Sequence, residues 1–210
     1  MTRLRCFCLC ACLAFSLTAM ACGSSNSGAT SGWDQARIAF TGVSWWLNAI
    51  KSAYYFELKI TPSAQEDAVG RATVITFAQK VVSGVKSSTA APQTLVPAAA
   101  SSSGWTLDQN VPKTANGVVT ATDATSATNL IDGGADPFYD PSKSYSAKGL
   151  AWEVYTNGTY SLDLKVWQMA SAHDASQIYS DLLSDPLYSP DNVPWITCNG
   201  TDTSNPCPAQ

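Results

Sequence analysis

Two segments of the chain share a pattern that constrains its fold. Residues 54–60 read Tyr-Tyr-Phe-Glu-Leu-Lys-Ile, and residues 160–166 read Tyr-Ser-Leu-Asp-Leu-Lys-Val. Both alternate apolar with polar side chains, which is typical of a half-buried β-strand. Each is followed by a pattern typical of a helix start, a serine (Ser63 or Ser171) with an acidic residue three positions later. The sequence therefore predicts an α+β fold, an antiparallel sheet with helices packed on one face, built from a duplicated strand–helix unit.

A low-complexity stretch divides the chain into two such units. It covers residues 83–103, is rich in Ser, Ala, Thr and Pro, and is typical of a linker or a long surface loop. The first α+β unit is expected over residues 33–82 and the second over residues 104–197. A tail with two cysteines follows at residues 198–210.

Apolar spacing predicts three helices. One is expected to begin at Ser171, and a longer one is expected over residues 64–82, because apolar side chains recur there every three or four residues. The same spacing over residues 43–50 predicts a short amphipathic helix before the first strand.

The second unit contains a predicted hairpin, with strands at 150–155 and 160–166 joined across Thr-Asn-Gly-Thr. A two-residue Asn-Gly turn would place the apolar side chains of the two strands on opposite faces. A three-residue loop with Gly158 in the left-handed conformation pairs Val154 with Tyr160 and gathers them on one face. Burying them together is worth about 1.5–3 kcal/mol each, so we predict this loop. The other face then carries Glu153, Tyr155, Asp163, Lys165 and Trp167.

The first 21 residues have the layout of an export signal. Two arginines precede an apolar run at 6–17, and Ala-Met-Ala at 19–21 directly precedes Cys22. This order is typical of a cleavable signal peptide, and the apolar run is too short to span a bilayer stably. We therefore expect residues 1–21 to be removed, along with four of the seven cysteines.

Two fates are open for Cys22. Lipoprotein processing would cut before it and acylate it, and the Gly- and Ser-rich residues 22–32 would form a flexible tether. Ordinary signal peptidase would cut the same bond and leave a free thiol on a secreted protein. We favour lipid attachment at Cys22, because acylation removes the one cysteine without a partner in an oxidising compartment.

Cys198 and Cys207 are predicted to form a disulfide. They enclose a polar loop rich in turn-forming residues, and no second cysteine pair or nearby histidine completes a zinc site. Closing so short a loop is worth about 2–3 kcal/mol. The residues before it, with Trp195 and Ile196 as anchor, are expected to lie extended against the body of the protein.

The charge balance argues against nucleic acid as a partner. Ten basic and sixteen acidic residues follow residue 21, which gives the mature chain a formal net charge of −6. Phosphate binding depends on clustered Lys and Arg, and this composition does not favour it. Apolar residues make up 45% of the chain, enough to bury a core, so the chain as a whole is not disordered.

Several short motifs occur in the order found in a known family. A tryptophan-led segment is followed by Asn-Leu-Ile-Asp-Gly-Gly-Ala at 129–135 and an aromatic residue, then by the hairpin and by Met-Ala-Ser at 169–171. Over about residues 104–183 the chain resembles an uncharacterised family of exported bacterial proteins. It departs from the family's pattern at Asp136-Pro137, where a continuing helix is expected. The resemblance implies fold and export, and it implies no activity.

The same run supplies most of the candidate binding residues. Its aspartates recur every four residues near Asp123, and calcium favours several such oxygens. The spacing matches no EF-hand loop, and Asp before Gly or Pro is ordinary turn chemistry, so we predict turns and no metal site. A short helix is expected from about Ser126 to the two glycines. The candidate binding set comprises Asp132, Gly133, Gly134, Asp136, Tyr139 and Trp167, with Asp140 as a further aspartate of the run.

The sequence predicts neither a catalytic residue nor a cofactor. His173 is the only histidine, and with Ser171 and Asp174 it falls in the first turn of a helix, where such residues cap and meet solvent. The acidic and basic residues of segments 54–60 and 160–166 are expected to form solvated cross-strand pairs rather than a carboxylate acid/base pair.

These observations favour a ligand- or partner-binding module. We expect a protein of the bacterial envelope, periplasmic or on its outer face, held to the membrane by a lipid anchor, with secretion as the alternative. Tryptophan rings can stack on sugars or peptides, but in small exported domains they more often belong to the core. Of the seven tryptophans, Trp167 is the candidate contact for a protein or glycan partner, because it is expected on the polar face of its strand. The alternative function is a calcium-dependent or carboxylate-based hydrolase that acts on envelope or extracellular polymers through the Asp-rich run.

Overall fold

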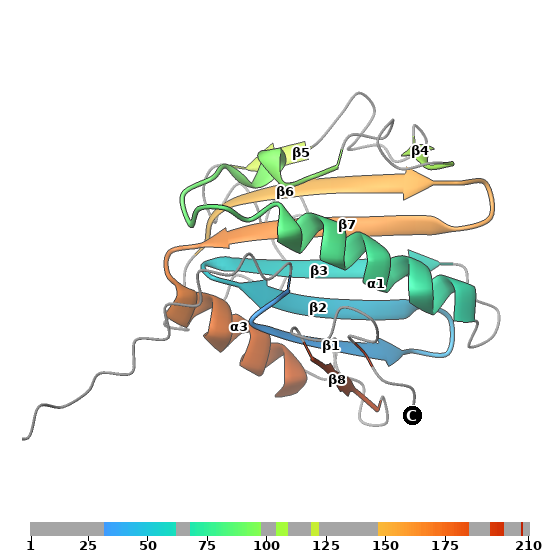
Figure 1. Ribbon diagram of the computed structural model, residues 1–210, viewed down its shortest axis with the longest axis horizontal. Coiled ribbons are helices and arrows are strands. Elements are labelled where there is room, and N and C mark those ends of the chain that lie inside the picture. The colour runs from blue at the N-terminus through green and yellow to red at the C-terminus, as the bar shows by residue number, and fades with distance from the viewer. Residues whose placement is uncertain are drawn as a thin grey trace, which may run out of the picture.

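The structure is a computed structural model that describes residues 32–61, 68–97, 104–108, 119–121, 147–184, 194–199 and 207. Its elements are β1 (Gln35–Phe40), β2 (Trp45–Lys51), β3 (Tyr54–Thr61), α1 (Ala68–Ser83), the 3₁₀-helix η1 (Pro92–Thr94), β4 (Thr106–Leu107), β5 (Val119–Ala121), β6 (Ala147–Thr156), β7 (Ser161–Met169), α3 (Ala172–Ser184) and β8 (Ile196–Cys198). Antiparallel strands form one sheet in the order β4-β6-β7-β3-β2-β1-β8, with β5 also on β6 (Figure 1). The predicted α+β class with an antiparallel sheet is confirmed.

The two α-helices of the described residues cover opposite faces of the sheet, whereas we expected the helices on one face. Helix α1 packs on the face that carries Phe56, Leu58 and Leu164, which we call the α1 face. Helix α3 packs on the face that carries Tyr55 and Trp167, which we call the α3 face. Both faces are therefore buried. A strand in such a sheet can be apolar on both sides, so its sequence need not alternate between apolar and polar residues.

The duplicated pattern holds for the strands and ends there. The two matching segments become β3 and β7, which lie side by side and pair from Tyr54 opposite Gln168 to Thr61 opposite Ser161. Their aligned apolar side chains all point to the α1 face, yet α1 and α3 then turn to opposite faces. The cap predicted at Ser171 is confirmed, because its hydroxyl accepts the backbone N–H of Asp174 at 3.1 Å. The equivalent Ser63 lies outside the described residues.

Residues 45–51 form strand β2, where we expected a short helix. Trp45 and Leu47 point to the α1 face, and Trp46 and Asn48 point to the α3 face. Because both faces are covered, the strand is apolar along most of its length and its spacing imitates a helix. Strand β1 had no predicted counterpart for the same reason.

The β6–β7 hairpin has a different register from the predicted one. Thr156 pairs with Ser161, so four residues form the loop, with Gly158 at φ +84° as expected for its left-handed role. Leu150 then lies opposite Trp167 on the α3 face, and the apolar side chains of β6 and β7 are divided between the two faces. The prediction assumed that only one face of the sheet is buried. Because α3 covers the second face, apolar side chains can be buried on both.

The low-complexity segment packs against the sheet in its described part. Leu95 is buried, and the hydroxyl of Tyr54 on β3 donates to the carbonyl of Ser87 at 3.2 Å. The hydroxyl of Tyr155 on β6 donates to the carbonyl of Pro97 at 2.6 Å. The strands before and after this segment belong to one sheet, so it is a packed loop within a continuous structure.

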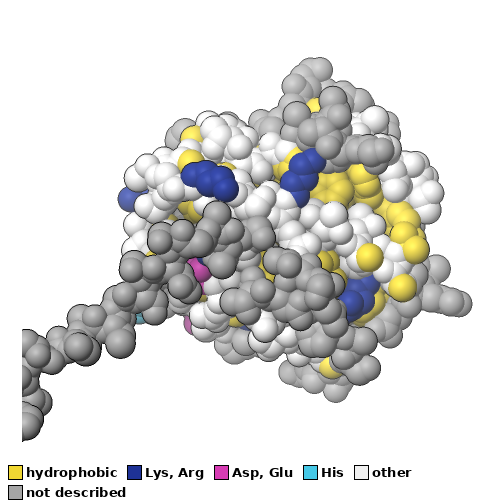
Figure 2. Space-filling model, viewed as in Figure 1, with side chains coloured by type: hydrophobic (Ala, Val, Ile, Leu, Met, Phe, Trp, Pro, Cys, Tyr) yellow, Lys and Arg dark blue, Asp and Glu magenta, His cyan; other side chains and the backbone are white. Residues whose placement is uncertain are grey.

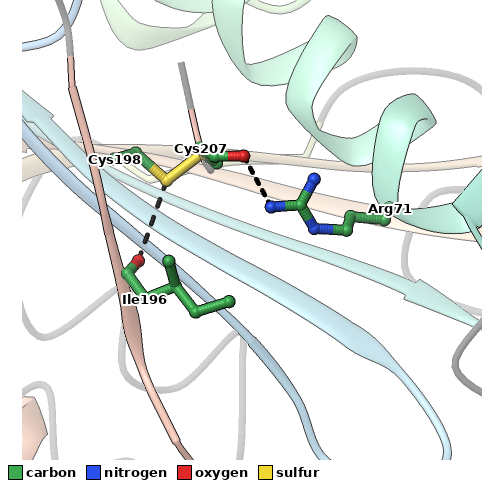
Figure 3. Close-up of a disulfide and its surroundings, with 4 residues drawn as sticks. All are labelled: Arg71, Ile196, Cys198 and Cys207. Atoms are coloured by element: carbon green, nitrogen blue, oxygen red, sulfur yellow. Dashed lines mark hydrogen bonds between the residues drawn. A yellow bond between two sulfur atoms is a disulfide. The ribbon is translucent and has the colours of Figure 1, made fainter. Parts of the chain in front are cut away.

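The predicted disulfide between Cys198 and Cys207 is present (Figure 3). Both cysteines are buried in the apolar cluster of the α1 face. Arg71 of α1 donates to the carbonyl of Cys207 at 2.6 Å, and β8 pairs with β1 through Ile196 opposite Ile38. In its described residues 194–199 the tail is therefore extended against the body, as predicted. Among the described residues, no helix is long and apolar enough to cross a membrane.

Candidate functional site

Polar and charged side chains line up across the α3 face, which we call the polar row. Its members lie opposite one another on successive strands: Arg37 on β1, Asn48 on β2, Glu57 on β3, Lys165 on β7 and Trp152 on β6. Arg37 and Asn48 are each 3% exposed, and Glu57 is 5% exposed. Successive side chains of a strand point to opposite faces, so these five neighbouring residues all lie on the same face. Covering that face buries the row.

The row contains a buried ion pair. Lys165 Nζ lies 3.1 Å from Glu57 Oε1, and both side chains are largely removed from solvent. We expected these cross-strand charges to be solvated. Their pairing is confirmed and their exposure is corrected, because α3 packs against this face.

Two further contacts on the α3 face involve residues that lie two positions from the polar row on β2, β3 and β7. Trp152 Nε1 donates to Asp163 Oδ1 at 2.8 Å, and Lys59 Nζ lies 5.1 Å from the centre of the Trp46 ring. Burial raises the pKa of Asp163, and the nearby Lys165 opposes that shift. The α3 face therefore holds several charged groups in a poorly solvated setting.

Arg37 stands out within the row. Its Cζ lies 4.1 Å from the centre of the Tyr179 ring of α3 and 4.9 Å from that of Trp195 in the tail. Burial lowers the pKa of Arg37, and the Tyr55 and Tyr179 hydroxyls oppose the shift. The Tyr179 hydroxyl lies close to the guanidinium group, and by distance and angle Nε, Nη1 and Nη2 have no hydrogen-bond acceptor among the described residues. A buried guanidinium group in this state costs free energy.

Two acceptors of the same row are also buried. Oδ1 of Asn48 and Oε2 of Glu57 accept no hydrogen bond from the described residues. Asn48 lies directly opposite Arg37, so an unused acceptor stands beside an unused cluster of donors. A polar group that carries both a negative charge and a hydrogen-bond donor would satisfy both side chains.

Trp167 is not an exposed stacking surface. It is 1% exposed and packs under α3 with Ile50, Met169 and Ile178. We predicted it on the polar face, which is correct, but that face is covered. Its ring belongs to the apolar cluster next to the polar row.

Several predicted residues lie outside the described residues. They are Cys22 and the candidate binding residues Asp132, Gly133, Gly134, Asp136 and Tyr139. His173 lies exposed in the first turn of α3, where we expected it. The described residues contain no group of His, Cys, Asp or Glu that could hold a metal ion.

A second candidate surface lies on the other side of the sheet. A hollow of about 520 Å³ runs along α1, lined by Ala68, Val69, Ala72, Thr73, Thr76, Phe77, Lys80 and Trp105. Val69 is 63% exposed, and the Trp105 ring meets that of Phe77 edge-on at 5.3 Å. Figure 2 shows hydrophobic side chains exposed on this side of the molecule, with basic side chains among them. We call this surface the α1 hollow.

Comparison with protein-family models, curated proteins and solved structures finds no match to this chain. The resemblance to a family of exported bacterial proteins therefore stays a prediction. Arg37 and Asn48 were missed because their strands were not recognised. One signal was available: Arg37 is a single charged residue within the apolar run Ala-Arg-Ile-Ala-Phe.

Proposed function

We propose that this chain is an exported, lipid-anchored protein of the bacterial envelope that binds a small ligand on the α3 face of its sheet. Residues 1–21 would direct export, Cys22 would carry the lipid, and residues 22–32 would tether the folded body. The disulfide Cys198–Cys207 supports an oxidising compartment, since such bonds persist outside the cytoplasm.

The observation that carries the binding function is Arg37. A sheet face buried for stability alone would place an apolar residue there, because a buried cation without an acceptor is unfavourable. Binding sites keep such groups, since the ligand supplies the missing partner. The polar row thus fits a recognition surface better than a structural one.

Replacing Arg37 tests this function. Arg37→Met fills the same space without the charge, so we expect the free energy of unfolding to rise by about 1–2 kcal/mol. Arg71→Met is the matched control on the α1 face: it removes the bond to the Cys207 carbonyl and should lower stability. Chemical denaturation of the three proteins gives the comparison. A clear loss of stability in Arg37→Met would assign Arg37 a structural role.

Anchoring has its own test. Growth with radioactive palmitate should label the protein, and Cys22→Ser should abolish the label. Unlabelled protein released to the medium would instead support the secreted alternative.

The hydrolase alternative depends on Asp132, Asp136 and Asp140. If it holds, calcium-dependent turnover of an envelope polymer should disappear in Asp132→Asn.

The α1 hollow offers a further surface for a protein or glycan partner, with Trp105 as the stacking group.

A further inference from the structure

The geometry points to a small carboxylate as the ligand of Arg37, held through both of its oxygens by the guanidinium group. This inference rests on the proposed function, since it names the ligand class of the same site. Arg37 supplies a planar fork of N–H donors that matches a carboxylate in two parallel hydrogen bonds.

By distance and angle, none of the described contacts of Arg37 satisfies those donors. Tyr179 and Trp195 contact the guanidinium group through their ring faces, which attract a cation without accepting its N–H groups as a carboxylate does. No described acidic residue forms an ion pair with Arg37, while the nearest cation along the row, Lys165, is paired with Glu57 at 3.1 Å. Arg37 is therefore the cation of the row that lacks an opposite charge.

The same charges favour a single negative charge on the ligand. Glu57 lies two strands from Arg37 in the row and is buried, so it disfavours a second negative charge nearby. A monocarboxylate satisfies Arg37 with one charge, whereas phosphate brings about one and a half at neutral pH.

Asn48 narrows the class further. Its Oδ1 is buried beside Arg37 and accepts no hydrogen bond from the described residues. A hydroxyl or amino group on the carbon next to the carboxylate would fill this role. The ligand class is accordingly a small hydroxy- or amino-carboxylic acid.

The test is a set of calorimetric titrations of the purified protein with sodium acetate, sodium glycolate and sodium phosphate. Sodium chloride keeps the ionic strength constant, and the buffer contains no carboxylate. We expect saturable binding of acetate, tighter binding of glycolate because its hydroxyl reaches Asn48, and no saturable binding of phosphate. Magnetisation transfer from the acetate methyl protons to the rings of Tyr179 and Trp195 should locate the ligand.

Three variants and a control define the site. Arg37→Met should abolish acetate binding, and Arg37→Lys should weaken it about ten- to hundred-fold, because lysine keeps the charge and loses the fork. Asn48→Ala should remove the advantage of glycolate and leave acetate binding intact. Arg71→Met, on the α1 face, should leave both affinities unchanged.

The outcomes separate this inference from the proposed function. Acetate binding that survives Arg37→Met overturns the inference, and equal affinity for acetate and glycolate overturns the role of Asn48. Arg37-dependent binding of phosphate alone overturns the carboxylate class and leaves the binding function standing. If no anion binds and Arg37→Met is more stable than the wild type, the carboxylate is wrong and the function stands. If no anion binds and Arg37→Met is less stable, both are wrong.

Discussion

The two faces of the sheet are buried by different chemistry. On the α1 face, apolar side chains of β1, β2, β3 and β7 meet Val74, Phe77 and Val81 of α1 in one large cluster. On the α3 face, a smaller apolar cluster around Trp167 lies next to the polar row. This contrast is what we expect if the α1 face supports the fold and the α3 face carries the proposed binding site.

One residue departs from this division. Glu153 of β6 points to the α1 face, is fully buried, and its Oε2 has no hydrogen-bond donor among the described residues. Burial raises the pKa of Glu153. The pKa of Tyr155, two residues along the strand, is also raised, first by burial and then by the charge of Glu153.

The largest expected effect comes from breaking the buried ion pair. Lys165→Met leaves the Glu57 carboxylate buried without its cation, so we expect a loss of about 3–5 kcal/mol in the free energy of unfolding. Lys51→Met is the matched control, because the exposed pair of Lys51 with Asp34 has a similar 3.0 Å distance and should cost about 0–1 kcal/mol. Urea denaturation measures both. Equal losses would show that the α3 face is effectively solvated and would remove the contrast between the faces.

The tail that carries the disulfide contacts both faces, and removing the disulfide should have the next largest effect. Cys198 and Cys207 lie in the α1-face cluster, whereas Trp195, three residues before Cys198, contacts Arg37 on the α3 face. Replacing both cysteines with serine should lower the free energy of unfolding by about 2–3 kcal/mol. It should also change the near-ultraviolet circular dichroism of the aromatic side chains. Reduced wild-type protein serves as the control, and an unchanged aromatic signal would show that Trp195 holds its place without the disulfide.

Glu153→Gln should have the smallest effect, and that effect should depend on pH. Because burial raises the pKa of Glu153 in the folded state, the folded protein holds this proton more tightly than the unfolded chain. Wild-type stability should therefore fall as the pH rises from the ordinary carboxyl pKa of 4.5 through the folded pKa. Glu153→Gln should remove this part of the decline and stabilise the protein at neutral pH, by on the order of 1 kcal/mol. Stability curves that stay parallel from pH 4 to pH 8 would contradict the prediction.

Much of the fold follows from local patterns. The alternation in residues 54–60 and 160–166 predicted β3 and β7, and the cap at Ser171 predicted the start of α3. These predictions succeed because side-chain period and helix capping depend on neighbours in the chain. The disulfide was also predictable, since residues 22–210 contain no other cysteine apart from Cys22.

The candidate site was much less predictable. Arg37 and Asn48 lie on strands covered on both sides, where the apolar run shows no alternation and imitates a helix. Trp167 was placed on the correct face of the sheet. Its burial depends on α3, which we expected on the other face, together with α1. Partners that come from β1, β7 and the tail cannot be read from any single window of sequence.

The sequence by itself determined the strand-forming segments, the helix starts, the pairing of the last two cysteines and the acidic charge balance, because these depend on composition and on nearby residues. Tertiary structure alone decided that the helices lie on opposite faces, that the β6–β7 register divides its apolar side chains, and that Arg37 meets Tyr179 and Trp195. The physical reason is that burial belongs to the whole sheet: a strand carries its side chains to both faces, and only the packed helices fix what each face must be.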